Sequence, residues 1–440
     1  MNRTVEATRE MKDSGIEWIG KIPQEWELAP LKAILKERKE KNLPIKTTNI
    51  LSLTIDKGVI PYSEKSGGGN KAKEDLTAYK LTYPNDIVLN SMNVIAGAVG
   101  LSKYFGAVSP VYYTLYGDEK INCTSYFNDI FQTQAFQKSL LGLGNGIMMK
   151  ESSTGKLNTI RMRIPMEKLK SVMLPVPPLH EQQAIANYLD EQVGKIDELI
   201  TEQRIAIEKW KEYKQSLITE TVTKGLNPDV EMKDSGIEWV GEIPSNWETV
   251  FINQLFTQLK NKNTEMQETN LLSLSYGKIV RKNIETKEGL LPENFNGYNV
   301  INAGDIVLRL TDLQNDQRSL RCGIAKERGI ITSAYVTLRN IKPLVNNYYY
   351  YLIHAYDIMK VFYGMGSGVR QGLTFDGLKK MRLLVPSIEN QQQIADYLDE
   401  KCSKIDESIQ QKQVLIQQLE EYKQSLIYEC VTGKRCVEER

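Results

Sequence analysis

The sequence predicts an α+β protein built from two tandem copies of one mixed module, each followed by a long helix. Three observations support this prediction. Residues 11–27, MKDSGIEWIGKIPQEWE, recur at 232–248 as MKDSGIEWVGEIPSNWE, with thirteen of seventeen positions identical. Short β-type runs lie between Gly, Pro and Asn residues and do not alternate regularly with helical segments. Apolar residues at alternating spacings of three and four mark one long helix in each copy.

The duplication runs through the whole chain. DIVL occurs at 86–89 and 305–308, YKQSLI at 213–218 and 422–427, and GLGNG at 142–146 matches GMGSG at 364–368. The offset falls from 222 residues at the Gly-rich stretch to 209 at the helices, so the first copy carries thirteen extra residues after Gly146. This period is far longer than that of a solenoid. We therefore predict a first module at 1–177, a helix at 178–225, a second module at 226–386 and a helix at 387–435.

Each module is predicted to combine short strands with one helix. ILSLTI (50–55), DIVLN (86–90) and SPVYYTLYG (109–117), with their second-copy equivalents, have the composition of strands. SYFNDIFQTQAFQKSLLG (125–142) and NYYYYLIHAYDIMKVFYG (347–364) each predict a single helix.

The two long polar segments predict helices with matching apolar stripes. Pro177-Pro178 and Pro386 favour a helix start just after them, and Gly225 favours an end to the first helix. Some 45 residues at 1.5 Å each give a rod roughly 65 Å long. The stripes consist of Ile185, Leu189, Val193, Ile196, Ile200, Ile207, Trp210 and Leu217, and of Ile394, Leu398, Cys402, Ile405, Ile409, Ile416, Leu419 and Leu426. They pack most simply against each other, as an antiparallel coiled coil with pseudo-two-fold symmetry.

Composition excludes several classes of protein. No apolar run approaches the ~18 residues of a membrane span, and residues 1–15 lack the apolar core of a secretory signal. Five scattered cysteines without a CxxC predict reduced thiols in a cytoplasm, and no metal site. There is no phosphate-binding loop and no Asn/Asp-Pro-Pro-aromatic motif of an amino-methyltransferase. His180 and His354 are the only histidines, and we interpret His354 as a satisfied helix residue. We expect no cofactor and no catalytic residue.

The framework of the two copies matches, but their loops differ. SEKSGGGNKAKEDLTAYK (63–80) has RKNIETKEGLLPENFNGY (281–298) as its counterpart. Duplex DNA presents two-fold related surfaces, and a rigid spacer would hold two modules over two half-sites. Divergent loops on a shared scaffold suit two specificities, although drift after duplication gives the same pattern.

GIEWIGKIPQEWE, DIVL, GMGSGVRQGL, LKKMRLLVPSIENQQQIADYLDEKCSKIDE and the repeated YKQSLI resemble the specificity (S) subunit of type I restriction–modification systems, over nearly the whole chain. The resemblance implies two target recognition domains that each read half of a bipartite DNA site. It implies helical regions that fix the gap between the half-sites. It also implies two methyltransferase (M) subunits, and restriction (R) subunits in the full complex, as partners. A coiled-coil scaffold without DNA readout is the alternative.

Net charge is only +1, so a DNA-binding surface must be local. After each Gly-rich stretch the charge is +4, from six basic and two acidic residues at 150–170 and from five and one at 360–382. Arg and Lys neutralise phosphates, and glycine allows close approach of the backbone. Predicted phosphate contacts are Lys150, Lys156, Arg161, Arg163, Arg370, Gln371 and Lys379. An ordinary solvated basic loop is the alternative.

Base readout needs Asn, Gln, Arg or Lys at a groove edge. Asn90 and Asn93 follow DIVL in the first copy, and Arg309 takes the place of Asn90 in the second, followed by Gln314, Arg318 and Arg321. Asn suits adenine and Arg suits guanine. A loop residue satisfied by its own backbone is the competing interpretation. Lys65, Asn70, Lys71 and Lys73 form a further candidate loop, or a tip that makes no contact.

The outer faces of the helices are candidates for docking the M subunits. Four residues recur at equivalent positions: Gln182, Gln183, Tyr188 and Asp190 match Gln391, Gln392, Tyr397 and Asp399. Their retention fits a shared partner surface or a shared helical fold, and the sequence leaves both interpretations open.

Overall fold

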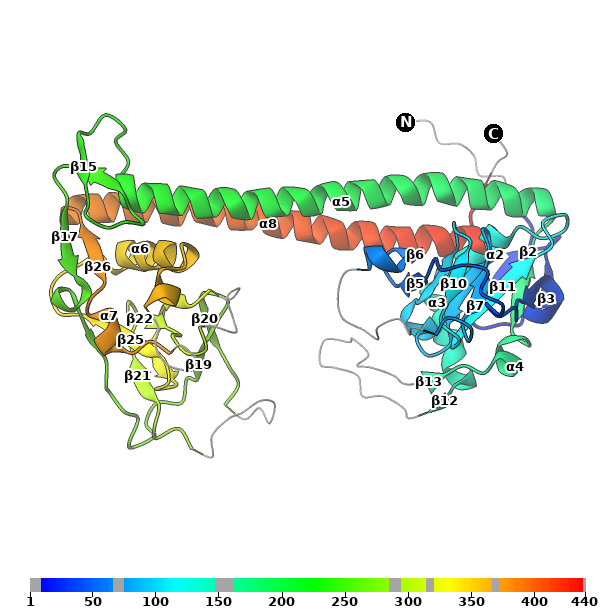
Figure 1. Cartoon of the computed structure of the whole chain (residues 1–440), viewed down its shortest axis with the longest axis horizontal. Helices are drawn as coiled ribbons and strands as arrows, with labels where there is room; N and C mark the ends of the chain where they lie inside the picture. The colour runs from blue at the N-terminus through cyan, green and yellow to red at the C-terminus, as the bar shows by residue number, and fades with distance from the viewer. Residues whose placement is uncertain are drawn as a thin grey trace. The chain divides into compact units, whose positions relative to one another are not determined.

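The computed structural model describes residues 9–65, 75–146, 162–284, 294–313, 320–365 and 372–437. It contains two compact units (Figure 1). Unit 1 comprises Met1–Gln203 and Val414–Arg440, and unit 2 comprises Arg204–Gln413. The helices α5 (Leu179–Lys224) and α8 (Ile388–Val431) each contribute one half to each unit. The boundary between the two units therefore falls near the middle of each long helix, not at its ends.

Unit 1 is centred on a four-stranded antiparallel sheet in the order β4 (Leu35–Glu37), β11 (Tyr112–Gly117), β8 (Ile87–Asn90) and β9 (Val99–Leu101). Two-stranded ladders surround this sheet: β1 (Met11–Asp13) with β2 (Lys21–Pro23), β3 (Glu27–Pro30) with β14 (Met173–Val176), β5 (Leu51–Thr54) with β6 (Gly58–Pro61), β7 (Lys80–Thr82) with β10 (Gly106–Val108), and β12 (Asn145–Gly146) with β13 (Met162–Arg163). Short helices α1 (Leu31–Ile34) and α4 (Met166–Leu169) flank the β3–β14 ladder.

Unit 2 repeats this plan. Its central sheet has the order β18 (Phe256–Gln258), β25 (Val336–Asn340), β22 (Ile306–Leu308) and β23 (Cys322–Ile324). Its ladders are β15 (Met232–Asp234) with β16 (Glu242–Pro244), β17 (Glu248–Phe251) with β26 (Arg382–Val385), β19 (Leu272–Ser275) with β20 (Lys278–Arg281), and β21 (Asn299–Ile301) with β24 (Gly329–Ile331), and the short helix α7 (Phe375–Leu378) precedes β26. The predicted duplication and the α+β class are confirmed.

The prediction of one unbroken helix per module is wrong in both copies. In unit 1 the segment divides into α2 (Thr124–Gln132), α3 (Gln134–Ser139) and the 3-10 turn η3 (Leu140–Leu143). Thr133 is extended, and its hydroxyl accepts a hydrogen bond from the amide of Phe136 at 3.3 Å, which caps α3. In unit 2, α6 (Asn346–Ile358) ends before Lys360, whose φ is +61°, and the 3-10 turn η5 (Val361–Gly364) follows.

The repeated IPxxW segment anchors each unit to the end of one long helix. Trp26 is fully buried and Trp247 is 2 % exposed. In unit 1 a Cβ on Gly433, just after α8, would lie 2.3 Å from a side-chain atom of Pro23. In unit 2 a Cβ on Gly225, just after α5, would lie 3.3 Å from the Trp247 ring. Both glycines have positive φ, +70° and +77°, a backbone conformation that favours glycine at the end of a helix.

In each unit, one tyrosine hydrogen-bonds to the last turn of the long helix that ends beside the IPxxW segment. The Tyr126 hydroxyl donates to the carbonyl oxygen of Val431 at 3.0 Å, and that of Tyr348 to Val222 at 3.2 Å. These bonds satisfy carbonyls that have no partner within the helix. The end of α5 therefore completes the second module, whereas the end of α8, encoded some 400 residues after Trp26, completes the first.

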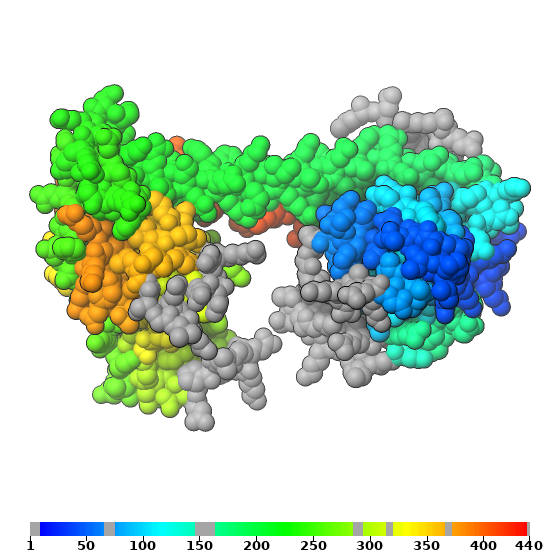
Figure 2. All heavy atoms as spheres, in the orientation of Figure 1, coloured from blue at the N-terminus to red at the C-terminus, as the bar shows by residue number. Residues whose placement is uncertain are grey.

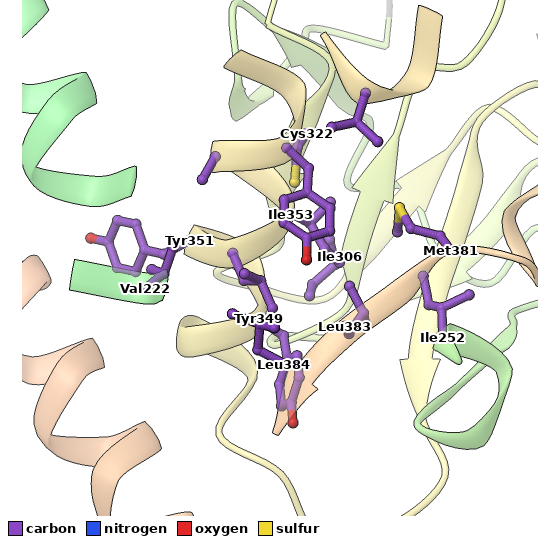
Figure 3. Packing of buried hydrophobic residues seen from close by; sticks show 14 of the residues in the cluster. Val222, Ile252, Ile306, Cys322, Tyr349, Tyr351, Ile353, Met381, Leu383 and Leu384 are labelled. Carbon is purple, nitrogen blue, oxygen red and sulfur yellow. The ribbon is translucent and has the colours of Figure 1, made fainter. Parts of the chain in front are cut away.

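The apolar core of each unit lies between its central sheet and the helices of that unit. In unit 2, Tyr349 and Ile353 of α6 face Ile306, Leu383 and Leu384 (Figure 3). Within each unit, segments of α5 and α8 lie side by side and are joined by an ion pair, Lys423–Asp197 at 2.7 Å in unit 1 and Lys214–Asp406 at 2.7 Å in unit 2. The predicted stripes are largely buried there, at Ile185, Leu189, Ile196, Ile200, Ile207, Ile394, Leu398, Cys402, Ile405 and Leu426.

Candidate nucleic-acid interface

In each unit the fold brings together the two regions that the sequence assigned to DNA. The amide of Ile164, next to Arg163 in the basic stretch, donates to the carbonyl of Ser91, just after DIVL, at 2.9 Å. In unit 2 the equivalent bond runs from the amide of Leu373 to the carbonyl of Leu310, also at 2.9 Å. The candidate base-reading turn and the candidate phosphate-binding stretch are therefore neighbours in both copies, although more than 60 residues separate them in the sequence.

The turn from β8 to β9 in unit 1 is closed by its own backbone. The side-chain oxygen of Asn90 accepts from the amide of Met92 at 3.0 Å, and its carbonyl accepts from the amide of Asn93 at 2.9 Å. The carbonyl of Asn93 accepts from the amides of Ala96 and Ala98 at 2.9 and 3.1 Å. This self-contained turn leaves the side chain of Asn93 exposed, whereas the side-chain oxygen of Asn90 is already engaged.

Basic side chains cluster around Arg163 in unit 1. Arg163 is exposed on β13, opposite Asn145. Burial lowers the pKa of Lys80, and the nearby charges of Arg163 and Lys39 add to this effect, while Glu37 opposes it. The carboxylate of Glu37 lies 3.9 Å from the ammonium groups of both Lys39 and Lys80, so the positive charge of these lysines is partly balanced within the protein. The ammonium of Lys65, a further candidate, lies 5.7 Å from the Tyr62 ring centre.

In unit 2, the described candidates Arg309 and Lys379 differ in exposure. Arg309 follows β22 and is half-buried, and Lys379 is exposed and pairs with Asp376 at 2.6 Å. The hydrogen bond from Lys379 holds the pKa of the Asp376 carboxyl below its usual range. The remaining predicted contacts lie outside the described residues: Asn70, Lys71, Lys73, Lys150, Lys156, Arg161, Gln314, Arg318, Arg370 and Gln371.

Arg321 requires a correction. The sequence suggested a base-reading side chain, but Arg321 is fully buried. Its guanidinium donates to the carbonyls of Arg309, Thr311 and Asp312 and to the Tyr363 hydroxyl, at 2.8–3.1 Å. A guanidinium engaged in this way cannot reach a groove edge in this structure, because withdrawing it would leave buried carbonyls without donors.

Gln182 and Gln391, predicted to face a partner, also require a correction. Each is 1 % exposed. Gln182 donates to the Pro177 carbonyl at 2.8 Å and accepts from the Cys123 amide at 2.9 Å. Gln391 makes the same pair of bonds, to the Pro386 carbonyl at 2.9 Å and from the Val345 amide at 3.2 Å. Both glutamines tie a helix start to its module, so a shared fold explains their recurrence.

The other six predicted partner residues lie at the surface or partly exposed. Gln183, Asp190, Gln392 and Asp399 are exposed, and Tyr188 and Tyr397 are half-buried. Asp399 accepts from Tyr351 at 2.7 Å and from Asn347 at 2.8 Å, which ties α6 to α8. Gln392 donates to Asp396 at 2.8 Å. These residues stay candidates for a docking surface.

His354 lies on α6 and is buried, with its ring centre 5.7 Å from that of Tyr350. Its Nδ1 has no hydrogen-bond partner among the described residues. Burial, with a smaller contribution from the charge of Lys214, lowers the pKa of His354 to about 4. His354 is therefore neutral in the fold at physiological pH. The interpretation of His354 as a satisfied residue is wrong for Nδ1.

We expect His354 to make unit 2 less stable in mild acid. Its folded-state pKa lies below the ordinary value of 6.5, so stability is complete above that value and falls as the pH drops towards 4. The linkage amounts to up to about 3 kcal/mol. His354→Gln introduces glutamine, the residue at the equivalent position 132 of the first copy. This variant should lose less stability as the pH falls. Urea unfolding of both chains between pH 7 and pH 4 measures it, and parallel pH profiles would contradict the prediction.

Among the described residues, no group of three or more His, Cys, Asp or Glu side chains is placed to hold a metal ion. Within the same part of the chain, no helix combines the length and the apolar character needed to cross a membrane. The cysteines are free thiols, and all but Cys436 are buried.

The structure thus contains two equivalent α+β units with divergent polar turns, each completed by segments of the same pair of helices. The family of the type I restriction modification DNA specificity domain matches residues 23–209 and 244–421, and the chain belongs to this family. DNA recognition for a type I restriction–modification system is therefore its function, and the resemblance noted in the sequence is confirmed.

Two relatives agree with this assignment, and a solved structure shares the fold. The chain is 24 % identical to the putative type I restriction enzyme MjaX specificity subunit of Methanocaldococcus jannaschii, over 94 % of this chain and 95 % of that one. It is also 24 % identical to the MjaVIII specificity subunit of the same organism, over 94 % of each chain. A chain from a structural study of the assembly and conformational transition of the type I R-M system shares the fold, with a TM-score of 0.66, 12 % identity, and coverage of 94 % of this chain and 99 % of that one.

Proposed function

We propose that each unit reads one half of a bipartite DNA site. The turn after β8 and the turn after β22 contact bases, and the basic stretch beside each turn contacts phosphates. The two helices set the gap between the half-sites. In this proposal the chain itself catalyses no step. Its role is to place other subunits on a specific DNA sequence.

The observation that carries this proposal is the pair of backbone bonds from Ile164 to Ser91 and from Leu373 to Leu310. A base-reading side chain and a phosphate-binding side chain must be held together to fix register and sequence at once. Equivalent bonds hold dissimilar turns in the two units. Asn93, exposed in one turn, and Arg309 in the other carry side chains that suit different bases.

We also propose that two M subunits dock on the helices, with R subunits joining in the full complex. The sequence patterns missed the exposed apolar residues that support this. Val414 and Tyr422 of α8 are 48 % and 50 % exposed in unit 1, and their equivalents Ile205 and Tyr213 of α5 are 52 % and 53 % exposed in unit 2. Side chains of α5 are open to solvent along the face shown in Figure 2. Two equivalent apolar pairs suit two copies of one partner.

The decisive experiment is genome-wide methylation mapping of cells that carry this chain with its cognate M subunit, against cells that lack the chain. We expect two defined sequence blocks separated by a fixed undefined gap, lost when the chain is deleted. Native mass measurement of the purified complex should give two M subunits per chain. Active M subunits with no motif that depends on this chain would contradict the proposal and favour a scaffold.

A further inference from the structure

Arg321 organises the turn from β22 to β23, which is described at residues 309–313 and 320–321. Its Nη1 donates to the carbonyls of Arg309 and Thr311 at 3.1 and 2.8 Å, and its Nη2 donates to the carbonyl of Asp312 at 3.1 Å. Its Nε donates to the hydroxyl of Tyr363 at 3.1 Å. One buried side chain therefore holds three carbonyls of a four-residue segment.

The fourth carbonyl of this segment, that of Leu310, accepts the amide of Leu373. All four carbonyls of residues 309–312 thus have donors supplied by the protein. Leu310 and Leu313 are 1 % and 0 % exposed, so their buried side chains anchor the segment in the core. The side chain of Thr311 is exposed and that of Arg309 is half-buried. The backbone faces the core, and the polar side chains are left towards the surface.

The equivalent turn of unit 1 finds donors for its carbonyls without an arginine. The register of the strands pairs Leu89 with Val99 and Leu308 with Cys322, so Arg321 takes the position of Ala98. Residues 90–98 of unit 1 correspond to the longer segment 309–321 of unit 2. The shorter turn supplies its own backbone donors, as described above, whereas the longer one takes them from a side chain.

The guanidinium is well suited to this task because it is planar and presents five N–H donors in a fixed geometry. Without it, the carbonyls of residues 309, 311 and 312 would have to turn towards water, and the side chains between them would turn as well. The direction of Arg309, a candidate base contact, is therefore coupled to a residue 12 positions away.

We propose that Arg321 is a positioning residue for sequence reading. It holds residues 309–312 in the conformation that presents Arg309 to DNA, so the specificity of one half-site depends on a side chain that does not itself touch DNA. This inference rests on the proposed function of the unit 2 turn. It differs from a purely structural role because it predicts a defect confined to one block of the bipartite site.

The test replaces Arg321 by methionine, which keeps the apolar stem and removes the donors, in the complex of this chain with its M subunits. Competition binding with duplexes altered in one block at a time measures discrimination. In the block read by unit 2 we expect preference for the cognate base to fall about tenfold, corresponding to about 1.4 kcal/mol, with the other block unchanged. Amide exchange of residues 310–313 should rise. Arg321→Lys, with fewer donors in a less rigid arrangement, should give an intermediate loss.

Arg339→Met is the matched control. Arg339 also serves unit 2 through its guanidinium, with Nε 2.9 Å from Asp305 Oδ1, but it braces the start of β22 and not the turn after it. In unit 1 the equivalent aspartate, Asp86, also pairs with an arginine, but with Arg38 from the segment after β4. We expect this variant to be destabilised with unchanged discrimination in both blocks.

Unaltered discrimination in Arg321→Met would overturn the inference, and so would an equal loss in both blocks. Should Arg321→Met fail to fold, Arg321→Lys serves in its place. Unaltered discrimination in the block read by unit 2, together with faster amide exchange of residues 310–313, would then overturn the inference. If the unaltered chain directs no bipartite motif at all, the proposed function itself fails, which is a separate result.

Discussion

Exchanging residues 31–172 for the equivalent segment of a relative with a different target is expected to change one block of the methylated motif and leave the other block intact. The fold fixes these junctions. The β3–β14 ladder pairs Pro30 with Met173, and the amide of Leu31 donates to the carbonyl of Val172 at 2.8 Å. An exchange inside this ladder leaves the IPxxW segment and both helices in place. The exchanged segment contains Tyr126, so the relative must supply a tyrosine there to donate to Val431. Methylation mapping in cells with the same M subunit measures the outcome.

The matched exchange in unit 2 covers residues 252–381, inside the ladder of β17 with β26, where the amide of Ile252 donates to the carbonyl of Met381 at 2.9 Å. It should change the other block. The gap should stay constant in both exchanges, since the helices are untouched. An exchange that altered both blocks, or neither, would mean that the units do not read the half-sites separately.

Trp26→Ala is expected to destabilise unit 1 by about 3 to 5 kcal/mol, because it removes a fully buried indole. It also removes the hydrogen bond from Trp26 to Glu181 at 2.9 Å. The free energy of unfolding of a typical domain is only about 5 to 15 kcal/mol in total. Hydrogen exchange should therefore accelerate in unit 1, including the end of α8 around Val431, and leave the end of α5 protected. This coupling between residues some 400 apart is the specific expectation.

Trp247→Ala should give the mirror result, with loss of protection at the end of α5 around Val222. Trp239→Ala is the control, because Trp239 is 41 % exposed and its removal should cost far less. If Trp26→Ala left the end of α8 as protected as before, then that helix end would not belong to unit 1 in solution.

Periodicity predicted the helices well because their stripes are long and regular. The observed limits, Leu179–Lys224 and Ile388–Val431, fall close to the predicted 178–225 and 387–435. The break at Thr133 was not predicted, since a threonine within an apolar helical pattern has no sequence signature that separates an internal position from a cap.

The candidate site was predicted less well, for a physical reason. Arg321 and Gln182 have the residue types of contact residues, and their types do not tell whether the polar end meets a ligand or a buried backbone carbonyl. Recurrence of Gln182 as Gln391 was equally ambiguous, because a buried tie to a helix start is kept for the same reasons as a surface. The partnership of Ile164 with Ser91 is a tertiary contact with no local signal.

The completion of unit 1 by the end of α8 gives the chain the connectivity of a ring. Opening the connection at 226–231 and joining the segment after Gly433 to the segment before Met11 would preserve every contact described within each unit. Equally, each half of the polypeptide supplies one module together with the helix end that the other module lacks. Two identical halves would therefore supply each other with the missing helix end, so duplication of one such half yields a chain with two equivalent units.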